Sequence, residues 1–402
     1  MQKSLYPLLI SFVCINFTIS FITPYLSLDT ISYTGMNAIF IATIIFATPY
    51  IAQASTLQLF SRIAEKYHQE KTLLIISYSV NFLQFIILFF ISSQIQNALI
   101  ILVITFTANL FTIAYFPAIK AFIAHIGGDQ KGFALSRLNV IQTIAHGSGS
   151  LLGGILYDQI GIHSMFIISI LVASIALIMI FFIPSIKITP DKIKTDEITH
   201  THSELEKLHA GIKPIKLNKV RRSSKFTFKI ALQYQFWLSV FSTMFFGLYG
   251  PYLQSLGIGS WFYGASNVLA AILGALFFTL FGIIMDKYGP DALFWWGWIA
   301  YAIVYGVMFF ITNQIAIFIL WTIPAYSFCI GTEYLAGIQT DQTKAIQNMA
   351  KATSSRTFGL VLGIIFGGFL TMFMPMRWVL LVSTIGAIGM GIVAGIISFK
   401  TH

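Results

Sequence analysis

The chain has 402 residues, of which 57% are hydrophobic and 9% are charged, and its mean hydropathy is +0.81. Because about a quarter of the residues in soluble domains are charged, this composition excludes an ordinary soluble domain and predicts an integral membrane protein in a lipid bilayer. The net charge of +10 comes from short basic clusters between apolar runs, a pattern typical of cytoplasmic loops, so nucleic acid is not an expected partner.

Uncharged runs of the sequence predict the membrane-spanning helices, each of which needs about 20 apolar residues. The runs lie at 4–28, 30–61, 72–119, 138–157, 159–186, 230–285, 292–332, 357–376 and 378–399. Three of these runs are long enough for two helices and contain polar breaks, at 93–97, 254–260 and 313–314. The sequence therefore predicts an all-α membrane protein with twelve spanning helices, six before and six after a central polar segment.

This central segment divides the chain into two halves of similar length. We expect an N-terminal six-helix bundle at 1–186, a basic cytoplasmic central loop at 187–227 and a C-terminal six-helix bundle at 228–402. The loop holds ten Lys or Arg and five Asp or Glu residues, which excludes it from the membrane. His200 and His202 lie in it close to acidic residues, but two histidines without further ligands do not predict a metal site.

The distribution of basic residues predicts the orientation of the chain. If Lys3 is cytoplasmic, the positive-inside rule is satisfied, because only Arg377 of the 24 Lys and Arg residues falls outside. Both termini are therefore expected in the cytoplasm, with the chain in the inner (cytoplasmic) or plasma membrane. The apolar run at 1–28 is too long for a signal peptide and lacks a cleavage site, so we interpret it as the first helix.

Three landmarks of the first half recur in the second half, at offsets of 212 to 227 residues. Pro-Tyr-Leu ends the first helix at 24–26 and the seventh at 251–253, and Asp-Gln follows the fourth helix at 129–130 and the tenth at 341–342. The third landmark is a row of small residues in the fifth and eleventh helices, with Gly149, Gly153, Gly154, Gly363, Gly367 and Gly368. Internal repeats of this kind are typical of secondary transporters, which bind their substrate between the halves.

The glycine rows have a physical explanation. Small residues at every fourth position clear one face of a helix and let a second backbone approach closely. Because the rows occupy equivalent positions in both halves, we expect them to pack across the interface between the halves. Tight packing inside one half is the alternative.

With these features the chain resembles the major facilitator superfamily over essentially its whole length. That family has a Gly-x-x-x-Asp-Arg/Lys-x-Gly pattern between the second and third helices, often repeated between the eighth and ninth. Here the second copy is intact at 282–289, and the first copy, at 61–68, is degraded. The resemblance assigns a conformational loop motif to Gly282, Asp286, Lys287, Gly289, Glu65 and Lys66.

The resemblance further implies that Asp286 docks on the start of the fifth helix near Arg137, and Glu65 on the start of the eleventh near Arg356. A helix N-terminus attracts a carboxylate; solvated loop charges are the alternative. Two departures weaken the resemblance to drug/proton antiporters, since the fourth helix lacks their usual arginine and the fifth lacks their usual proline.

Three ionisable side chains are expected at membrane depth, where charge is costly and suggests function. Lys120 and Glu333 lie near the cytoplasmic ends of the fourth and tenth helices and would pair across the inner mouth of a cavity; separate snorkelling and hydrogen bonding is the alternative. His146 lies near the middle of the fifth helix, and an imidazole that titrates at about pH 6.5 suits a coupling proton. A histidine that is merely hydrogen-bonded within the bundle fits equally well.

The other polar side chains expected along the substrate path are uncharged and suit a neutral or zwitterionic solute. They are Asn16, Gln53, Asn109, Tyr115, Gln142, Gln235, Tyr249, Asn267 and Tyr326.

We therefore expect a secondary active transporter that moves a small polar solute by alternating access, coupled to protons, and that works as a monomer without a cofactor. An efflux carrier for a drug, siderophore or similar metabolite is the second transport alternative. A membrane receptor or assembly factor on a transporter-like scaffold is the alternative without transport. An enzyme is not expected, because the sequence shows no nucleophile–base set, metal cluster or phosphate-binding loop.

Overall fold

The structure, a computed structural model of the chain, describes residues 2–33, 37–67, 70–94, 97–119, 122, 131–183, 228–288, 291–323 and 342–400. Every regular element in these ranges is a helix. This agrees with the all-α prediction, since helices satisfy their own backbone hydrogen bonds in lipid.

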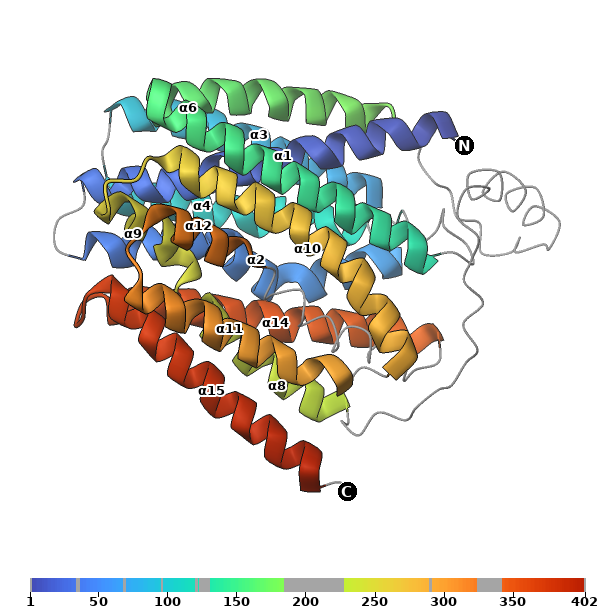
Figure 1. Cartoon of the computed structure of the whole chain (residues 1–402). Helices are drawn as coiled ribbons and strands as arrows, with labels where there is room; N and C mark the ends of the chain where they lie inside the picture. The colour runs from blue at the N-terminus through green and yellow to red at the C-terminus, as the bar shows by residue number, and fades with distance from the viewer. Residues whose placement is uncertain are drawn as a thin grey trace.

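The first part of the chain contains the described helices α1 (Gln2–Tyr33), α2 (Ala38–Tyr67), α3 (Glu70–Gln94), α4 (Ala98–Thr112) and α6 (Lys131–Phe181). α6 includes both the fifth and the sixth expected helices, and Figure 1 shows that the chain reverses its direction within it. The reversal occurs at Gly161, whose φ is 70° and ψ 170°. Only glycine adopts such angles at little steric cost.

The second part of the chain contains a broken helix followed by longer ones. α8 (Phe228–Thr243), the 3-10 helix η2 (Phe246–Leu248) and α9 (Tyr249–Ser255) together correspond to the seventh expected helix. They are followed by α10 (Ser260–Tyr288), α11 (Asp291–Phe310), α12 (Gln314–Thr322), α14 (Gln342–Leu370) and α15 (Met376–Lys400). In Figure 1 the N-terminal end of α1 lies on the right and the C-terminal end of α15 lies at the bottom.

Two of the polar breaks expected inside long apolar runs are helix N-caps. The side-chain oxygen of Asn97 accepts from the Leu99 N–H at 2.9 Å, and that of Asn313 accepts from the Ala316 N–H at 3.1 Å. The side-chain oxygen of an N-cap asparagine accepts from a backbone N–H of the first helical turn, which has no acceptor within the helix. The structure therefore confirms that helices begin at these two breaks.

The third break, between α9 and α10, is a Schellman turn. The Gly257 N–H donates to the Gln254 carbonyl at 2.9 Å, and the Ile258 N–H donates to the Leu253 carbonyl at 3.0 Å. Gly257 has a φ of 73°, the left-handed conformation that ends a helix in this motif. The chain turns here within three residues and begins α10 at Ser260.

The outside of the bundle is apolar, as a bilayer requires. Within the described ranges, seven helical segments are long and apolar enough to cross a membrane, and one of them, Val140–Phe181, includes both arms of α6. Large side chains face outward, with Phe90, Val103 and Phe310 exposed by 60%, 62% and 77%. An extended apolar surface of this kind marks membrane contact, so the chain is a multi-pass membrane protein.

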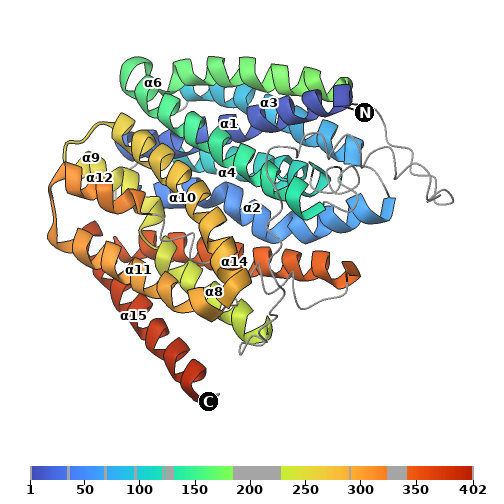
Figure 2. The same cartoon turned by 45° about the vertical axis from the view of Figure 1, so that its right-hand side comes forward.

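By their order in the chain, the described helices form a first group, α1 to α6, and a second group, α8 to α15. α1 packs along α6, and α2 packs beside α4, while α14 packs along α8 and α11 along α15. Two long contacts join the groups, one between α6 and α10 and the other between α2 and α14; Figure 2 shows α10 beside α6. The expected central loop at 187–227, with His200 and His202, lies outside the described residues.

The glycine rows of α6 and α14 face neighbours inside their own group. A Cβ on Gly149 would lie 2.5 Å from the Phe17 carbonyl oxygen of α1, and a Cβ on Gly363 would meet the Val240 carbonyl oxygen of α8. The prediction that the rows pack across the interface is wrong for four of the six glycines, because residues four apart share one helix face. These four are Gly149, Gly153, Gly363 and Gly367.

Gly154 and Gly368 do face the other group of helices. Each follows its row by one residue, which turns it about 100° around the helix axis. A Cβ on Gly154 would lie 2.5 Å from the Ser260 carbonyl oxygen of α10, and a Cβ on Gly368 would meet Thr43 of α2. At these two positions the structure agrees with the predicted packing between halves.

Gly149→Ala should destabilise the protein, because its Cβ would meet the α1 backbone, which cannot rotate away like a side chain. Overpacking of this kind costs about 1–3 kcal/mol, more than the helix propensity that alanine gains. Thermal unfolding of the purified protein measures the effect. Gly389→Ala is the matched control, since nothing lies within 4 Å of a Cβ there; equal melting temperatures for the two variants would contradict the assigned packing.

Candidate functional site

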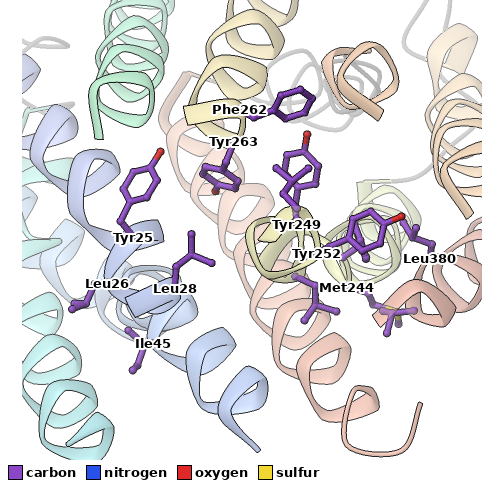
Figure 3. Packing of buried hydrophobic residues seen from close by; sticks show 14 of the residues in the cluster. Tyr25, Leu26, Leu28, Ile45, Met244, Tyr249, Tyr252, Phe262, Tyr263 and Leu380 are labelled. Carbon is purple, nitrogen blue, oxygen red and sulfur yellow. The ribbon is translucent and has the colours of Figure 1, made fainter. Parts of the chain in front are cut away.

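Four aromatic rings from α1, α9, α10 and α12 meet where the two groups of helices touch. Tyr25 and Tyr263 are 6.1 Å apart in an edge-to-face pair, Tyr263 and Tyr249 are 5.7 Å apart, and Tyr249 stacks on Trp321 at 3.6 Å. Figure 3 shows the three tyrosines between the helices. Such ring pairs add to the stability gained from burial alone. We call these four residues the interface aromatic cluster.

Two polar contacts fasten this cluster to α6. The Tyr25 hydroxyl donates to the Ser150 carbonyl oxygen. The Asn267 side chain of α10 donates to the Ser150 hydroxyl at 3.4 Å and accepts from the Trp321 indole N–H at 3.1 Å. Asn267, expected along the substrate path, therefore links α12 to α6 across the two groups, and Tyr249 lies fully buried beneath the indole.

The bundle is closed at the cluster. A space of about 10 Å³ remains between α1, α2, α9 and α10, lined by residues that include Ser27, Phe46 and Pro251. A cavity of this size is at the lower limit for a single water molecule. Among the residues that the structure describes, those lining this space leave no room for a solute between α1, α2, α9 and α10.

His146 lies between α6 and α1. Its Nδ1 pairs with the Ser20 hydroxyl of α1, and its Nε2 lies 3.4 Å from the side-chain nitrogen of Gln142, one turn earlier in α6. Because a neutral imidazole has one donor and one acceptor, a Gln142 N–H donating to Nε2 leaves Nδ1–H to donate to Ser20. The structure thus brings His146 and Gln142 together, as two of the expected site residues, on the α1 face of α6.

Asn16 and Tyr115 form a closed polar pair inside the first group of helices. The Tyr115 hydroxyl donates to the Asn16 side-chain oxygen at 2.9 Å, and the Asn16 amide donates to the Phe12 carbonyl at 2.7 Å. Both side chains are buried. Their hydrogen-bonding groups face each other and not the interface aromatic cluster.

Asn109 occupies a second polar pocket within the same group. Its amide donates to the Thr48 hydroxyl at 3.2 Å. Thr48, Asn81, Gln84, Thr105 and Asn109 line a space of about 10 Å³, which again holds no more than about one water molecule.

Gln235 and Gln53 are the remaining described candidates. Gln235 is 2% exposed, and its side-chain oxygen has no hydrogen-bond partner among the described residues. A buried carbonyl without a partner costs about 1–3 kcal/mol, so this oxygen is an acceptor available for a further group. Gln53 is half-buried on α2.

Several expected site residues lie outside the described residues: Lys120, Glu333, Tyr326 and Gly289. The pairing of Lys120 with Glu333 therefore stays a prediction. The rest of the conformational loop motif lies on helices and not in a loop, since α2 continues to Tyr67 and α10 to Tyr288. The helix ends expected from the uncharged runs left out the last turns of α2 and α10, because the charged end of each helix extends beyond its apolar part.

Ser20, Ser150, Tyr263 and Trp321 were not predicted as parts of a site. Each lies in an apolar run, and none is ionisable at neutral pH, so charge and hydropathy gave no signal. The one usable signal was the shared Pro-Tyr-Leu ending, because Tyr25 of its first copy belongs to the interface aromatic cluster.

A family model described as Major Facilitator Superfamily matches residues 8–345. The nucleoside transporter NupG is similar in structure, with a TM-score of 0.65 at 12% identity over 99% of both chains. A POT family transporter in complex with 5-aminolevulinic acid gives a TM-score of 0.72 at 12% identity, over 99% of this chain and 96% of that one.

The xylose transporter XylE from E. coli, in an inward open conformation, gives a TM-score of 0.66 at 12% identity, over 97% of this chain and 95% of that one. At such identities the likeness shows the common fold alone. No curated protein sequence matches the chain.

Tyr115→Phe should lower stability, because it leaves the Asn16 side-chain oxygen buried without its donor. The expected loss is about 1–3 kcal/mol, seen as a lower melting temperature of the purified protein. Tyr6→Phe removes a hydroxyl from a side chain that is 66% exposed and serves as the control. A Tyr115→Phe variant as stable as this control would show that the pair contributes little to the fold.

Proposed function

The chain belongs to the Major Facilitator Superfamily, a family of membrane transporters and not of enzymes, and we propose that it moves a small polar solute by alternating access. Secondary transporters of this fold bind substrate between two helix bundles that rock about a central site. We assign the two bundles to residues 1–186 and 228–402, joined by a cytoplasmic loop at 187–227.

The observation that carries this proposal is the kind of contact that joins the two groups of helices. At the interface aromatic cluster it consists of ring edges, glycine-lined backbone contacts and the Asn267–Ser150 hydrogen bond. Ring pairs and neutral hydrogen bonds are each worth about 0.5–1.5 kcal/mol, and none of these contacts is covalent, so they separate and reform one at a time. They support alternate opening of the bundle at this end.

The described polar side chains among the expected site residues support an uncharged or zwitterionic substrate. Amides and aromatic hydroxyls dominate, and Gln235 offers a buried acceptor. NupG carries nucleosides, XylE carries xylose, and the POT family transporter binds 5-aminolevulinic acid, so small polar solutes are accommodated by the same fold. We propose a substrate of that general size and polarity.

Uptake and efflux of labelled metabolites in proteoliposomes test the proposal. Nucleosides, pentoses, hexoses, amino acids and dipeptides should be offered with and without an imposed pH gradient. Movement of one class above protein-free vesicles supports transport, and the side on which it accumulates gives the direction, which separates uptake from export. Binding without movement in any condition would contradict it and favour a receptor.

We propose that protons drive the carrier through His146. The imidazole lies in the membrane span between α6 and α1 and holds a partner on each ring nitrogen. When Nε2 gains a proton, it becomes a hydrogen-bond donor instead of an acceptor. The side-chain amide of Gln142 must then rotate to present its oxygen to the ring. The exchange itself takes place within α6, but the proton adds a positive charge to the ring beside its Nδ1–H contact with Ser20 of α1.

His146→Ala should abolish accumulation driven by a pH gradient while leaving substrate exchange at zero gradient measurable. His163→Ala is the matched control, because His163 is exposed and stacks on Phe89 at 4.4 Å, away from α1. Both variants are assayed in proteoliposomes with the substrate found above. Gradient-driven accumulation at the reference rate in His146→Ala would place proton coupling elsewhere, with Glu333 as the next candidate.

We also propose that both termini are cytoplasmic, in an inner or plasma membrane, on the basis of the positive-inside rule. Asn97→Cys and Asn313→Cys, at the two helix N-caps, should then react with an impermeant thiol reagent added outside intact cells. Ser203→Cys, in the central loop, should react only after the cells are opened. External labelling of Ser203→Cys would reverse the orientation.

A further inference from the structure

A carboxylate of α6 binds the first turn of α10 at the closed end of the bundle. One oxygen of Asp158 accepts from the Ser260 N–H at 3.2 Å, and the other accepts from the Trp261 N–H at 3.0 Å. Asp158 belongs to the first group of helices and Ser260 and Trp261 belong to the second, so this contact spans the interface. It lies on the same pair of helices as the Gly154 contact and the Asn267–Ser150 hydrogen bond.

α10 has no side-chain cap of its own. The residue before Ser260 is Gly259, which has no side chain to accept from the first helical N–H groups, although Ser, Thr, Asp or Asn is preferred there. The preceding Schellman turn at Gly257 delivers the chain directly into the helix. The donors that a helix normally caps locally are therefore capped from the opposite half of the protein.

Gly259 also makes room for the carboxylate. A Cβ at this position would lie 3.1 Å from an oxygen of Asp158 and 3.0 Å from the Trp261 ring. The local sequence thus omits a cap and leaves space for one that comes from α6. A negative charge at a helix N-terminus is further favoured by the helix dipole.

We propose that Asp158 is a latch residue, which holds this mouth of the carrier closed by capping α10 from α6 and lets go each time the mouth opens. The inference rests on the proposed alternating-access function. When α6 and α10 separate, α10 loses its only described cap at these two N–H groups, so water must replace the carboxylate. Because Asp158 is exposed, water replaces the α10 N–H groups around its carboxylate when they separate. The carboxylate is never left unsolvated, so the exchange is reversible.

The internal repeat does not conserve Asp158 at the equivalent position on the other edge of the interface. The offset of 214 that relates Gly154 to Gly368 maps Asp158 onto Met372, at the end of α14. A thioether cannot cap a helix as a carboxylate does. The α6–α10 edge therefore carries a carboxylate at a position where the repeat of the α2–α14 edge has methionine.

The reactivity of a cysteine inside the mouth tests the latch. Ser27 is 4% exposed and lines the small space next to the interface aromatic cluster, so Ser27→Cys reacts with a polar thiol reagent only when the mouth opens. The purified full-length protein carries Cys14→Ser and Cys329→Ser. Asp158→Ala should raise the labelling rate roughly fivefold, the factor expected for loss of one cap, and Asp158→Asn should raise it less.

A second variant separates the latch from simple helix capping. Gly259→Asp in the Asp158→Ala background gives α10 a cap of its own. The new side chain does not clash with the Asp158 carboxylate, because Asp158→Ala has removed it. A latch predicts that labelling of Ser27→Cys stays fast while melting temperature recovers. If the added cap also restores slow labelling, Asp158 acts only on helix stability and the proposal is wrong.

Gln159→Ala is the matched control, since Gln159 is the exposed neighbour of Asp158; its labelling rate should equal that of the reference protein. Equal rates for Asp158→Ala and the reference would overturn the latch. Labelling needs no substrate. A protein that transports nothing would disprove the proposed function and still report whether Asp158 closes the mouth.

Discussion

The backbone contacts of α6 with α1 on one side and α10 on the other are the constraint on which the rest of the structure depends. Both contacts need glycine, since a Cβ on Gly149 would touch the α1 backbone and a Cβ on Gly154 the α10 backbone. Helices that touch at the backbone gain dispersion contacts and need no apolar driving force, which lipid does not provide. The two glycines are five residues apart and differ by about 140° around α6, so one helix joins a partner in each group.

The two edges of the interface are built with different chemistry. The α6–α10 edge combines a glycine contact, the Asn267–Ser150 hydrogen bond and the Asp158 carboxylate. The α2–α14 edge has the Gly368 contact and a hydrogen bond of 3.4 Å from the Gln58 amide to the Ser354 hydroxyl. An internal repeat that gives both edges the same glycine thus has a carboxylate, Asp158, at one position and Met372 at the equivalent position of the other edge.

Much of the fold could be predicted because the bilayer imposes simple rules. Apolar runs gave the helices, and polar breaks gave the N-caps Asn97 and Asn313. The direction in which each glycine faces could not be predicted, because neighbours in a bundle are set by packing between distant segments. Asp158 was passed over for a related reason: a charge at the end of an apolar run looks like a loop residue until the helix it caps is known.

The site residues divide by whether their partners are local or distant. Gln142 and His146 are one turn apart on one helix, so their contact followed from helical spacing. Asn16 and Tyr115 are 99 positions apart and bind each other, a contact that no local spacing in the sequence predicts. Ser20 joins His146 to α1, the helix that also carries Tyr25. A proton on His146 would therefore place its charge against the helix whose tyrosine contacts α10 at the closed mouth.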